Sequence, residues 1–530
     1  MSRHDSLPPA PTSPVWPSAD PRGLFHLIDH EENGSVSLDE LLDRLAEEGI
    51  LYDDPRLQKF IQYLRAHGNQ QARRRPRVDR ESFERLVSHH AVVHHALTKG
   101  LIIPEFQDFC QEIEEIYHHA LSNNGGKVAD YIPQLARVNP DQFAVSICTI
   151  DGQRFSLGDA HANFCLQSTC KPINYCLAIE ELGVEAVHRH VGREPSGRSF
   201  NELSLTDAGL PHNPMINAGA IMCSSLIQRH VPMADRYEYI NDTWAKLCGN
   251  RPVGFNNSVY LSERQTADRN FALAYFMREK KAFPPGIDLV ETLELYFQCC
   301  SIESRTHDLA IAAATLANGG INPLSGETVF QVQTVQHCLS LMLTCGMYDF
   351  SGEFAFRIGL PAKSGVSGAL MIVIPNVMGI SIWSPRLDGH GNSVRGVQFC
   401  ERLIERYNFH HYDSLTYDGD KKNPRLRKYE SSMHKTVNLI WAASNGDLDE
   451  LKRLQAEGID LQMADYDGRT ALHLAAAEGQ REVVAYLLEQ GVNAAPQDRW
   501  GGTPLGDAER GGHQATIKLL KGWMRDLPNF

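Results

Sequence analysis

The last hundred residues of the chain repeat with a fixed period. Glycines recur at Gly446, Gly479 and Gly512, each 33 residues after the one before. Asp465 and Asp498 are separated by the same interval. A period of this length is typical of stacked supersecondary units, in which each unit buries its apolar face against the next. We therefore expect this part of the chain to fold as a short solenoid of helical repeats.

The repeat also carries a specific motif. Residues 467–476 read DGRTALHLAA, and the next repeat has Thr503-Pro504-Leu505 at the equivalent place. These residues resemble the signature of ankyrin repeats. The resemblance implies a module that docks a protein partner or another subunit; the alternative is a packing appendage with no partner. We expect the ankyrin repeats over residues 435–530, after a charged linker at 417–434.

Length and charge limit what the rest of the chain does. At 530 residues the chain is long enough for about three domains. It has 51 Lys and Arg against 65 Asp and Glu, a net charge of −14, which argues against a general binder of nucleic acid or of anionic membranes. The longest apolar stretch, residues 368–383, is broken by Pro375 and Asn376, so no membrane span is expected.

The N-terminus and the cysteines bear on the compartment. Residues 1–20 are rich in Pro and Ser and predict a disordered segment without the apolar core of a secretory leader. All twelve cysteines lie between Cys110 and Cys400 and none forms a CxxC pair, which predicts free, mostly buried thiols. We expect a cytoplasmic protein, with a mitochondrial location as the alternative.

Residues 21–120 predict a helical domain with an EF-hand-like loop. The loop at 29–40 fits the twelve-residue template, with Gly34 at the sharp turn. Its candidate calcium ligands are Asp29, Glu31, Asn33 and Glu40. Glu31 has a longer side chain than the residue usual at that position. EF-hand loops normally occur in pairs, and the segment that could be the second loop, residues 77–81, is degenerate. The sequence therefore favours a metal-free helix–loop–helix over a calcium site.

Ser168 and Lys171 form an S-x-x-K motif in the central region. Residues three apart on a helix share one face, so the lysine amine would lie beside the serine hydroxyl. A lysine whose pKa is lowered by burial and by a helix N-terminus can take the serine proton and so activate the hydroxyl for attack. Pro172 suits the first turn of a helix, which the pattern continues to Leu182.

A second motif lies far downstream. Lys363-Ser364-Gly365 leads into apolar segments at 367–374 and 378–383, which predict an antiparallel pair of strands. Another such pair is predicted at 143–150 and 153–157. S-x-x-K, then helices, then K-[ST]-G on a strand is the order found in β-lactamases and penicillin-binding proteins. It predicts an α/β catalytic domain of this DD-peptidase-like type and a serine acyl-transfer site.

Further segments of the central region resemble the serine-dependent glutaminases. The segments that carry the resemblance are DYIPQLA (130–136), FCLQS (164–168), PHNPMINAGA (211–220), SER (262–264), DRN (268–270), ATLANGG (314–320), CGMYDFSG (345–352) and LPAKSGV (360–366). The whole order, a helical domain, a catalytic domain at 121–416 and an ankyrin tail, resembles the kidney- and liver-type phosphate-activated glutaminases of animals.

The resemblance implies hydrolysis of L-glutamine to L-glutamate and ammonia, with no metal or organic cofactor. Ser168 would be the nucleophile, Lys171 its base and Tyr348 an aid to proton transfer. The backbone N–H groups of Ser168 and Val366 would form the oxyanion hole. The implied substrate-binding residues are Tyr131, Gln167, Asn217, Glu263, Asn270, Tyr296, Tyr348 and Val366. A zwitterionic substrate needs a carboxylate for its ammonium and amide donors for its own carboxylate, which this set contains.

The resemblance also implies a homotetramer, assembly into filaments and activation by phosphate. The family's activation loop corresponds to residues 197–204, where Phe200 and Leu203 fit an apolar contact between subunits. Ser204 stands where the mammalian enzymes carry a bulky apolar residue. The sequence therefore supports activation by the same route less strongly than it supports the activity.

Two other functions compete with glutamine hydrolysis. A β-lactam or peptide hydrolase on the same fold predicts an export signal, and the N-terminal segment does not resemble one. A scaffold built on the ankyrin repeats, with a vestigial site, predicts a broken set of catalytic groups, yet every candidate group is intact. We therefore expect a glutaminase.

Overall fold

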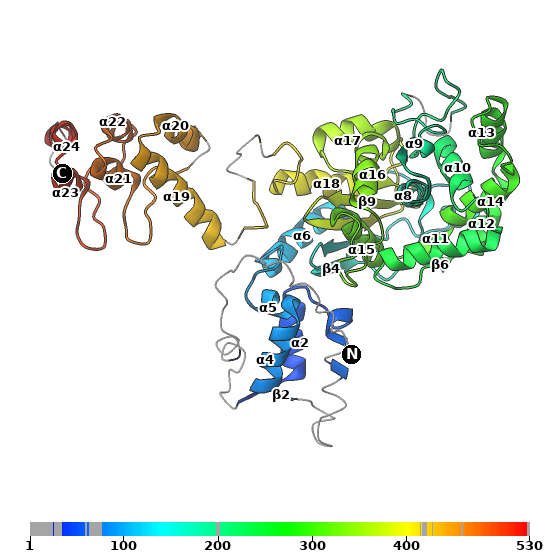
Figure 1. The fold of residues 1–530 in the computed structure, drawn as a ribbon, viewed down its shortest axis with the longest axis horizontal. Helices are drawn as coiled ribbons and strands as arrows, with labels where there is room; N and C mark the ends of the chain where they lie inside the picture. The colour runs from blue at the N-terminus through cyan, green and yellow to red at the C-terminus, as the bar shows by residue number, and fades with distance from the viewer. Residues whose placement is uncertain are drawn as a thin grey trace, which may run out of the picture.

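The computed structural model contains a small helical N-terminal domain, a large α/β domain and a C-terminal stack of helices (Figure 1). The residues that it describes are 25, 34–58, 61–62, 77–197, 202–413, 415, 421–426, 428–456 and 459–526. Several sequence expectations lie outside these residues, namely the disordered segment 1–20, the calcium candidates Asp29, Glu31 and Asn33, and the loop residue Phe200.

A five-stranded antiparallel sheet forms the centre of the α/β domain, with the strand order β4-β3-β10-β9-β8. Both strand pairs expected from the sequence are present as adjacent strands with a short connection. The strands are β3 (Ala144–Thr149), β4 (Arg154–Gly158), β8 (Ala362–Ser364), β9 (Ala369–Ile374) and β10 (Met378–Trp383). A smaller sheet has the order β5-β7-β6. Its strands are β5 (Phe164–Cys165), β6 (Gly254–Phe255) and β7 (Ile302–Ser304).

The strands β3, β9 and β10 are buried on both faces, which explains why their sequences are largely apolar runs. Along β9, Leu370 and Ile372 join one core cluster, whereas Met371 and Val373 join the other. Helices α6 (Phe106–Leu121) and α18 (Val394–Arg406) cover the first face, and α15 (Thr306–Ala317) covers the second. The strand period of two thus places alternate residues in two separate cores.

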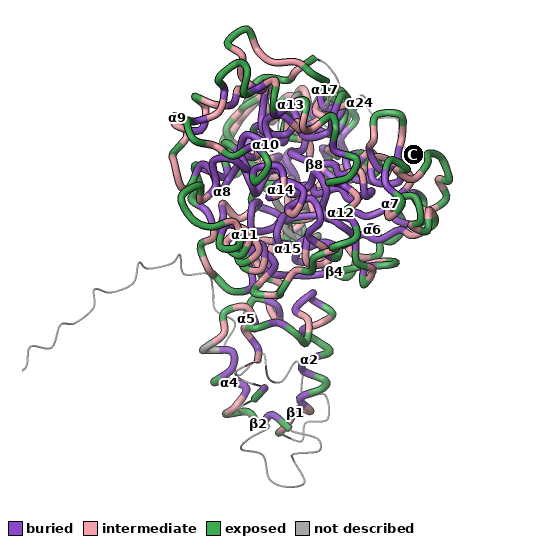
Figure 2. Tube along the Cα trace, turned by 90° about the vertical axis from the view of Figure 1, so that its right-hand side faces the viewer, coloured by how far each residue is buried: buried purple, intermediate pink, exposed green. Residues whose placement is uncertain are grey.

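Helix α15 packs on β10 at a glycine. A Cβ added to Gly379 would lie 2.2 Å from the backbone nitrogen of Ala314. This close approach of helix and strand needs a residue without a side chain. The sheet and α15 are therefore locked together at the centre of the domain, where Figure 2 shows mostly buried residues.

The other helices of the α/β domain surround this centre, and all twelve cysteines are free thiols, eleven of them buried, as expected. The helices are α7 (Pro133–Ala136), η1 (Gln167–Cys170), α8 (Lys171–Leu182), α9 (Val184–Val187), α10 (Asn217–Leu226), α11 (Met233–Leu247), α12 (Asn257–Gln265), α13 (Asp268–Glu279), α14 (Leu289–Cys300), α16 (Val332–Cys345), η2 (Tyr348–Phe350) and α17 (Ser351–Arg357).

The N-terminal domain is built on a two-stranded sheet, in which Val36 pairs with Val78. The strand at Val78 comes from the segment that the sequence marks as a degenerate second loop. Glu40, a calcium candidate, accepts a hydrogen bond from the Ser37 N–H (3.0 Å). It thereby forms a capping box at the start of α2, the helix to which it belongs. The elements are β1 (Ser35–Ser37), α2 (Leu38–Glu47), β2 (Arg77–Asp79), α4 (Arg80–His89) and α5 (Ala91–Leu97).

This domain is docked on the turn between β3 and β4. The buried Gln153 side chain donates to the carbonyls of Glu48 (3.1 Å) and Ile103 (3.0 Å) and accepts from the Ile103 N–H (2.9 Å). Next to it, the Arg154 N–H donates to the Gly49 carbonyl (2.8 Å). These bonds join the N-terminal domain to the edge of the large sheet.

The C-terminal helices follow the 33-residue period. Gly446, Gly479 and Gly512 all have a positive φ of 71° to 74°, which a glycine adopts without strain after a helix. The carboxylates of Asp465 and Asp498 each accept two backbone N–H groups of their own loop. The helices are α19 (Lys428–Asn445), α20 (Leu448–Ala456), α21 (Ala471–Ala477), α22 (Arg481–Glu489), α23 (Pro504–Gly511) and α24 (Gln514–Asp526).

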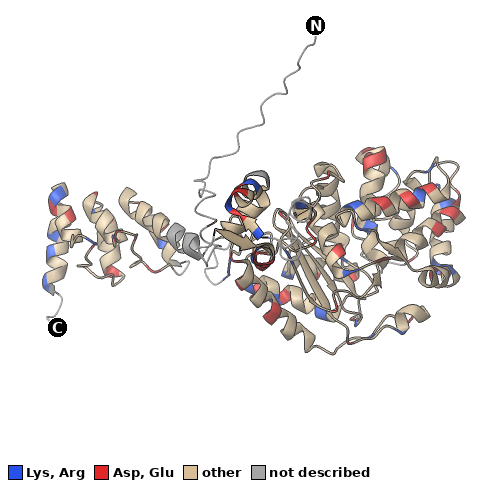
Figure 3. Ribbon diagram, turned by 90° about the horizontal axis from the view of Figure 1, so that it is seen from below, with Lys and Arg blue, Asp and Glu red and all other residues tan. Residues whose placement is uncertain are grey.

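Acidic and basic residues are interspersed along the helices (Figure 3). The longest apolar stretch of the sequence forms the hairpin of β9 and β10. In the described ranges, we find no helix with the length and apolarity that crossing a bilayer requires.

We expect Gly379→Ala to destabilise the α/β domain by about 1–3 kcal/mol, because the new methyl group would overlap the backbone of α15. Urea unfolding followed by fluorescence measures the loss. Gly352→Ala in α17 is the matched control, since a Cβ there meets nothing within 4 Å. Equal stability of the two variants would contradict the packing described above.

Candidate active site

Ser168 lies on the short 3₁₀ helix η1, which runs directly into α8 at Lys171. The sequence predicts the two residues on one helical turn, and the structure places that turn at the junction of two helix types. Both residues are buried, with 8% and 1% of their surface exposed. Gln167, just before Ser168, has a φ of +48°, a strained conformation that is typical of functional sites.

The Lys363-Ser364-Gly365 segment lies directly beside η1, as the sequence predicts. A Cβ added to Gly365 would lie 2.9 Å from the Leu166 carbonyl oxygen and 3.5 Å from the Ser168 nitrogen. A larger residue at this position would therefore push the strand away from Ser168. Val366 follows at once and is half-buried against the cluster that contains Ile132 and Leu135.

Tyr348 also borders Ser168. It is buried and has a φ of +54°, held by Ser351, whose hydroxyl donates to the Tyr348 carbonyl (2.7 Å) and accepts from the Met347 N–H (2.9 Å). Burial raises the pKa of the Tyr348 phenol, and a hydrogen bond with the Ser168 side chain opposes that rise. The phenol therefore stays protonated at neutral pH beside the serine hydroxyl.

The amine of Lys171 is buried beside an amide acceptor. It donates to Asn217 Oδ1 (2.7 Å), and the same oxygen accepts from the Tyr296 hydroxyl (3.3 Å). Asn217 Nδ2 in turn donates to Asn270 Oδ1 (3.1 Å). Burial lowers the pKa of Lys171 from 10.5 to about 8, because a charged amine loses its hydration there. A substantial fraction of the amine is therefore neutral near pH 8.

A second network begins at Glu263. Its Oε1 accepts from the Tyr131 hydroxyl (2.6 Å) and from Gln167 Nε2 (3.0 Å). Burial raises the pKa of Glu263, and the two hydrogen bonds oppose the rise. Tyr131 is half exposed, with 46% of its surface accessible, so this network reaches from solvent to the turn that carries Ser168.

The structure thus brings the predicted site residues together in two hydrogen-bonded groups. One group joins Lys171 to Asn217, Asn270 and Tyr296, and the other joins Glu263 to Tyr131 and Gln167. Glu40, from the calcium loop, lies in the N-terminal domain and is in neither group. Among the residues that the structure describes, no cluster of three or more His, Cys, Asp or Glu could hold a metal ion.

One residue of the site was missing from the sequence prediction. Lys363 is fully buried, donates to the carbonyls of Ser364 (2.6 Å) and Gly346 (3.2 Å), and lies 4.6 Å from the centre of the Tyr348 ring. Burial, and secondarily the charge of Lys171, hold its pKa well below its usual range. The K-[ST]-G motif contains this lysine and was the signal that could have identified it.

The lowered pKa of Lys171 predicts a pH-dependent stability. Between pH 8 and 10.5 the unfolded chain binds a proton that the native amine has lost, so the free energy of unfolding rises with pH. Between pH 7 and 9.5, the free energy of unfolding of the wild-type protein should rise by about 2 kcal/mol relative to that of Lys171→Met. Urea unfolding at each pH measures it. The matched control is Lys246→Met, at a half-exposed lysine. A wild-type advantage independent of pH would contradict the buried amine.

Comparison with known families and proteins identifies what this chain is similar to. The family model described as glutaminase matches residues 126–412, the EF-hand domain model matches 22–104 and the model of three ankyrin repeats matches 439–525. The chain is 48% identical to "Putative glutaminase 3" of Caenorhabditis elegans, over 94% of this chain and 86% of that one. It is 45% identical to the mitochondrial liver isoform of glutaminase of Mus musculus, over 94% and 83% of the two chains.

A solved structure agrees with these matches. The "Probable glutaminase ybaS" superposes with a TM-score of 0.53 and 38% identity, over 56% of this chain and 95% of that one. The predicted fold class, an α/β catalytic domain with an N-terminal EF-hand domain and C-terminal ankyrin repeats, is confirmed. The chain belongs to the glutaminase family.

Proposed function

We propose that the chain hydrolyses the side-chain amide of L-glutamine, giving L-glutamate and ammonia, through an acyl-enzyme at Ser168. The observation that carries the proposal is the buried Ser168–Lys171 turn, with an amine whose pKa is lowered to about 8. A neutral amine next to a hydroxyl is the arrangement that activates a serine for attack. The glutaminase names of the relatives support glutamine as the substrate.

In the first step, Ser168 Oγ attacks the amide carbon and its proton passes to the Lys171 amine. The carbonyl oxygen becomes an oxyanion, which the backbone N–H groups of Ser168 and Val366 would bind. Collapse of this intermediate breaks the C–N bond. The leaving nitrogen takes a proton from Lys171, either directly or through the Tyr348 hydroxyl, and departs as ammonia.

In the second step, water attacks the acyl-enzyme. Lys171, neutral again after it has given up its proton, accepts a proton from that water. The new oxyanion collapses, glutamate leaves, and Ser168 regains its proton. Because both steps use the same amine alternately as base and acid, a pKa near the working pH serves both directions of transfer.

The two hydrogen-bonded groups suit the ends of a zwitterionic amino acid. The Glu263 carboxylate would pair with the substrate ammonium, and Tyr131 and Gln167 hold that carboxylate in place. Asn217 and Asn270 would bind the substrate carboxylate. Recognition by several buried polar groups rejects ligands that leave them unpaired, which favours glutamine over a β-lactam or a peptide.

The assembly and regulation predicted by family resemblance stay predictions. Leu203 of the activation loop is exposed, with 44% of its surface accessible, so it is available to a tetramer contact. Activation by phosphate, filament formation and a protein partner for the ankyrin repeats belong to the same group of predictions. The mitochondrial location in the name of the mouse relative supports the mitochondrial alternative for this chain.

Ser168→Ala should lower the rate of glutamine hydrolysis by about a thousandfold or more, because alanine has no hydroxyl oxygen with which the acyl group could form an ester. Ammonia release measures the rate, and mass spectrometry of acid-quenched enzyme should detect a glutamyl adduct on the wild-type protein alone. Ser340→Ala, at an exposed serine of α16, is the control. Residual activity within tenfold of the wild type, or wild-type hydrolysis of a chromogenic β-lactam in place of glutamine, would refute the assignment.

Glu263→Gln should raise the KM for glutamine by roughly tenfold to a hundredfold, because a buried charge-assisted contact with the substrate ammonium is lost. The smaller change is expected in kcat, since the reacting amide lies at the other end of the substrate. Steady-state kinetics separates the two. Glu294→Gln, on the partly exposed face of α14, should leave both constants unchanged. A fall in kcat at constant KM would place Glu263 in the chemical step instead.

A further inference from the structure

A cavity of about 250 Å³ lies next to the candidate site. Four segments of the chain line this cavity and also carry, within one to four residues, a residue that we propose for substrate binding. The pairs of lining residue and site residue are Gln134 and Tyr131, Cys165 and Gln167, Val259 and Glu263, and Ser367 and Val366. The described residues of the lining include none of the proposed site residues, so a molecule bound here would leave the place of the substrate free.

An apolar cluster connects the cavity with the candidate site. Leu135, Cys165 and Val259 line the cavity and are buried together in this cluster. The side chain of Val366 packs against the same cluster. A ligand in the cavity would therefore contact the residues on which a wall of the site rests.

The lining contains buried polar atoms that lack a hydrogen-bond partner. Ser367 is 5% exposed, and its hydroxyl bonds to none of the residues that the structure describes. Its backbone is fixed, because Trp383 Nε1 donates to the Ser367 carbonyl (3.0 Å). Gln134 Oε1 is also buried and has no partner in the described part of the chain. A buried polar group without a partner costs about 1–3 kcal/mol, so both atoms favour a ligand that forms hydrogen bonds with them.

Glu303 determines the charge of the cavity. In the described lining, Glu303 is the one residue among Asp, Glu, Lys, Arg and His. Its Oε1 accepts from Asn256 Nδ2 (2.8 Å), and no described Lys, Arg or His forms an ion pair with it. The nearby Arg305 is exposed, and its Nε donates to Asn163 Oδ1 (2.9 Å). A lining with one carboxylate and no cation favours a positively charged ligand.

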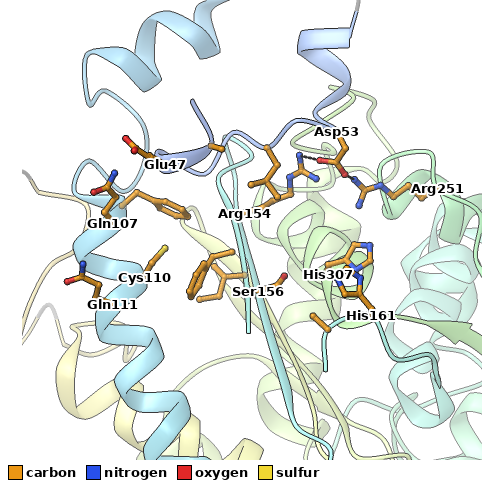
Figure 4. A pocket seen from close by; sticks show the side chains of 16 residues that line it. Glu47, Asp53, Gln107, Cys110, Gln111, Arg154, Ser156, His161, Arg251 and His307 are labelled. Carbon is orange, nitrogen blue, oxygen red and sulfur yellow. Dashed lines mark hydrogen bonds and ion pairs between the residues drawn. The ribbon is translucent and has the colours of Figure 1, made fainter. Parts of the chain in front are cut away.

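A larger recess beside β4 differs in this respect. It has a volume of about 780 Å³, and its two arginines, Arg154 and Arg251, both pair with the Asp53 carboxylate (Figure 4). The charged groups of that recess are therefore paired within the protein. In the smaller cavity, by contrast, the Glu303 carboxylate has no cationic partner in the described part of the chain.

Two aromatic rings supply apolar surface to the smaller cavity. Phe164 and Trp383 both line it and are buried, and their rings stack with centroids 5.5 Å apart. Aromatic rings attract ammonium groups as well as hydrocarbon. Sites for drug-sized ligands have volumes of roughly 300–1,000 Å³, so this cavity suits a smaller molecule.

We propose that this cavity binds a small organic cation, an ammonium group on a short hydrocarbon body. The ammonium group would donate to the Glu303 carboxylate, with Gln134 Oε1 and the Ser367 hydroxyl as further acceptors. The hydrocarbon body would lie against Phe164 and Trp383. An anion of the same size would be repelled by Glu303, and a neutral molecule would lose the charge-assisted hydrogen bond.

The experiment titrates n-pentylammonium chloride onto the full-length chain and follows binding by saturation-transfer NMR. The titrations use Glu263→Gln, because Glu263 is the other buried carboxylate that we expect to bind an ammonium group. The test variant adds Glu303→Gln, which removes the charge and keeps the shape of the side chain. The matched control adds Glu294→Gln, at a carboxylate that already pairs with Arg264. The measurement reads binding alone, so its outcome does not depend on glutamine hydrolysis.

We expect n-pentylammonium to bind the Glu263→Gln chain with a Kd of about 1–10 mM. Adding Glu303→Gln should weaken binding by about tenfold or more, and adding Glu294→Gln should leave it within about twofold. On the Glu263→Gln chain, n-pentanol and pentanoate should each bind at least about tenfold more weakly than the ammonium. This comparison of ligands stands even if the Glu303→Gln variant fails to fold. Absence of n-pentylammonium binding, unchanged binding in the Glu303→Gln variant, or equal binding of n-pentanol or pentanoate would overturn the proposal.

Discussion

The burial of the Lys171 amine is the constraint on which the rest of the site depends. A fully enclosed amine that keeps its charge loses its hydration. In place of water, the structure provides an amide acceptor, Asn217 Oδ1, at 2.7 Å. The imbalance favours the neutral amine, which is the form that can accept a proton from Ser168. The property that would allow Lys171 to act as the proposed base is therefore the same one that makes the site unfavourable for folding. The packing of the surrounding core has to offset the free energy that burial of this amine costs.

That core is arranged to hold the site in an unfavourable conformation. Gln167 and Tyr348 both have a positive φ, and they border Ser168 from two directions. Each strained residue costs of the order of 1–3 kcal/mol and persists only when its surroundings determine its conformation. Here Gln167 is held by Glu263, and Tyr348 by Ser351 on the adjoining helix. Behind them, a sheet buried on both faces gives η1 and β8 a fixed relative position.

The sequence predicted those parts of the structure that leave a periodic or local pattern. The apolar runs that became β3, β9 and β10, and the 33-residue period of the glycines, follow from strand burial and helix capping, which act over a few residues. Ser168 and Lys171 followed from the S-x-x-K spacing. The substrate-binding residues came from resemblance to a family, because hydrogen bonds between distant segments, such as that from Gln167 to Glu263, produce no spacing rule. For the same reason the docking of the N-terminal domain on Gln153 was not predictable. The 3₁₀ turn under Ser168 was also missed, since a helix pattern does not distinguish i+3 from i+4 bonding.

The position of the N-terminal domain relative to the site limits how the two can communicate. The domain is bonded to the turn beside β4, at one edge of the sheet, whereas Lys363 and Ser364 lie on β8 at the other edge. A shift of one residue between any two strands would move every side chain to the opposite face, and both faces are filled. The sheet therefore has no second register through which a displacement could pass. A sliding strand of this sheet therefore cannot carry an influence of the N-terminal domain to Ser168.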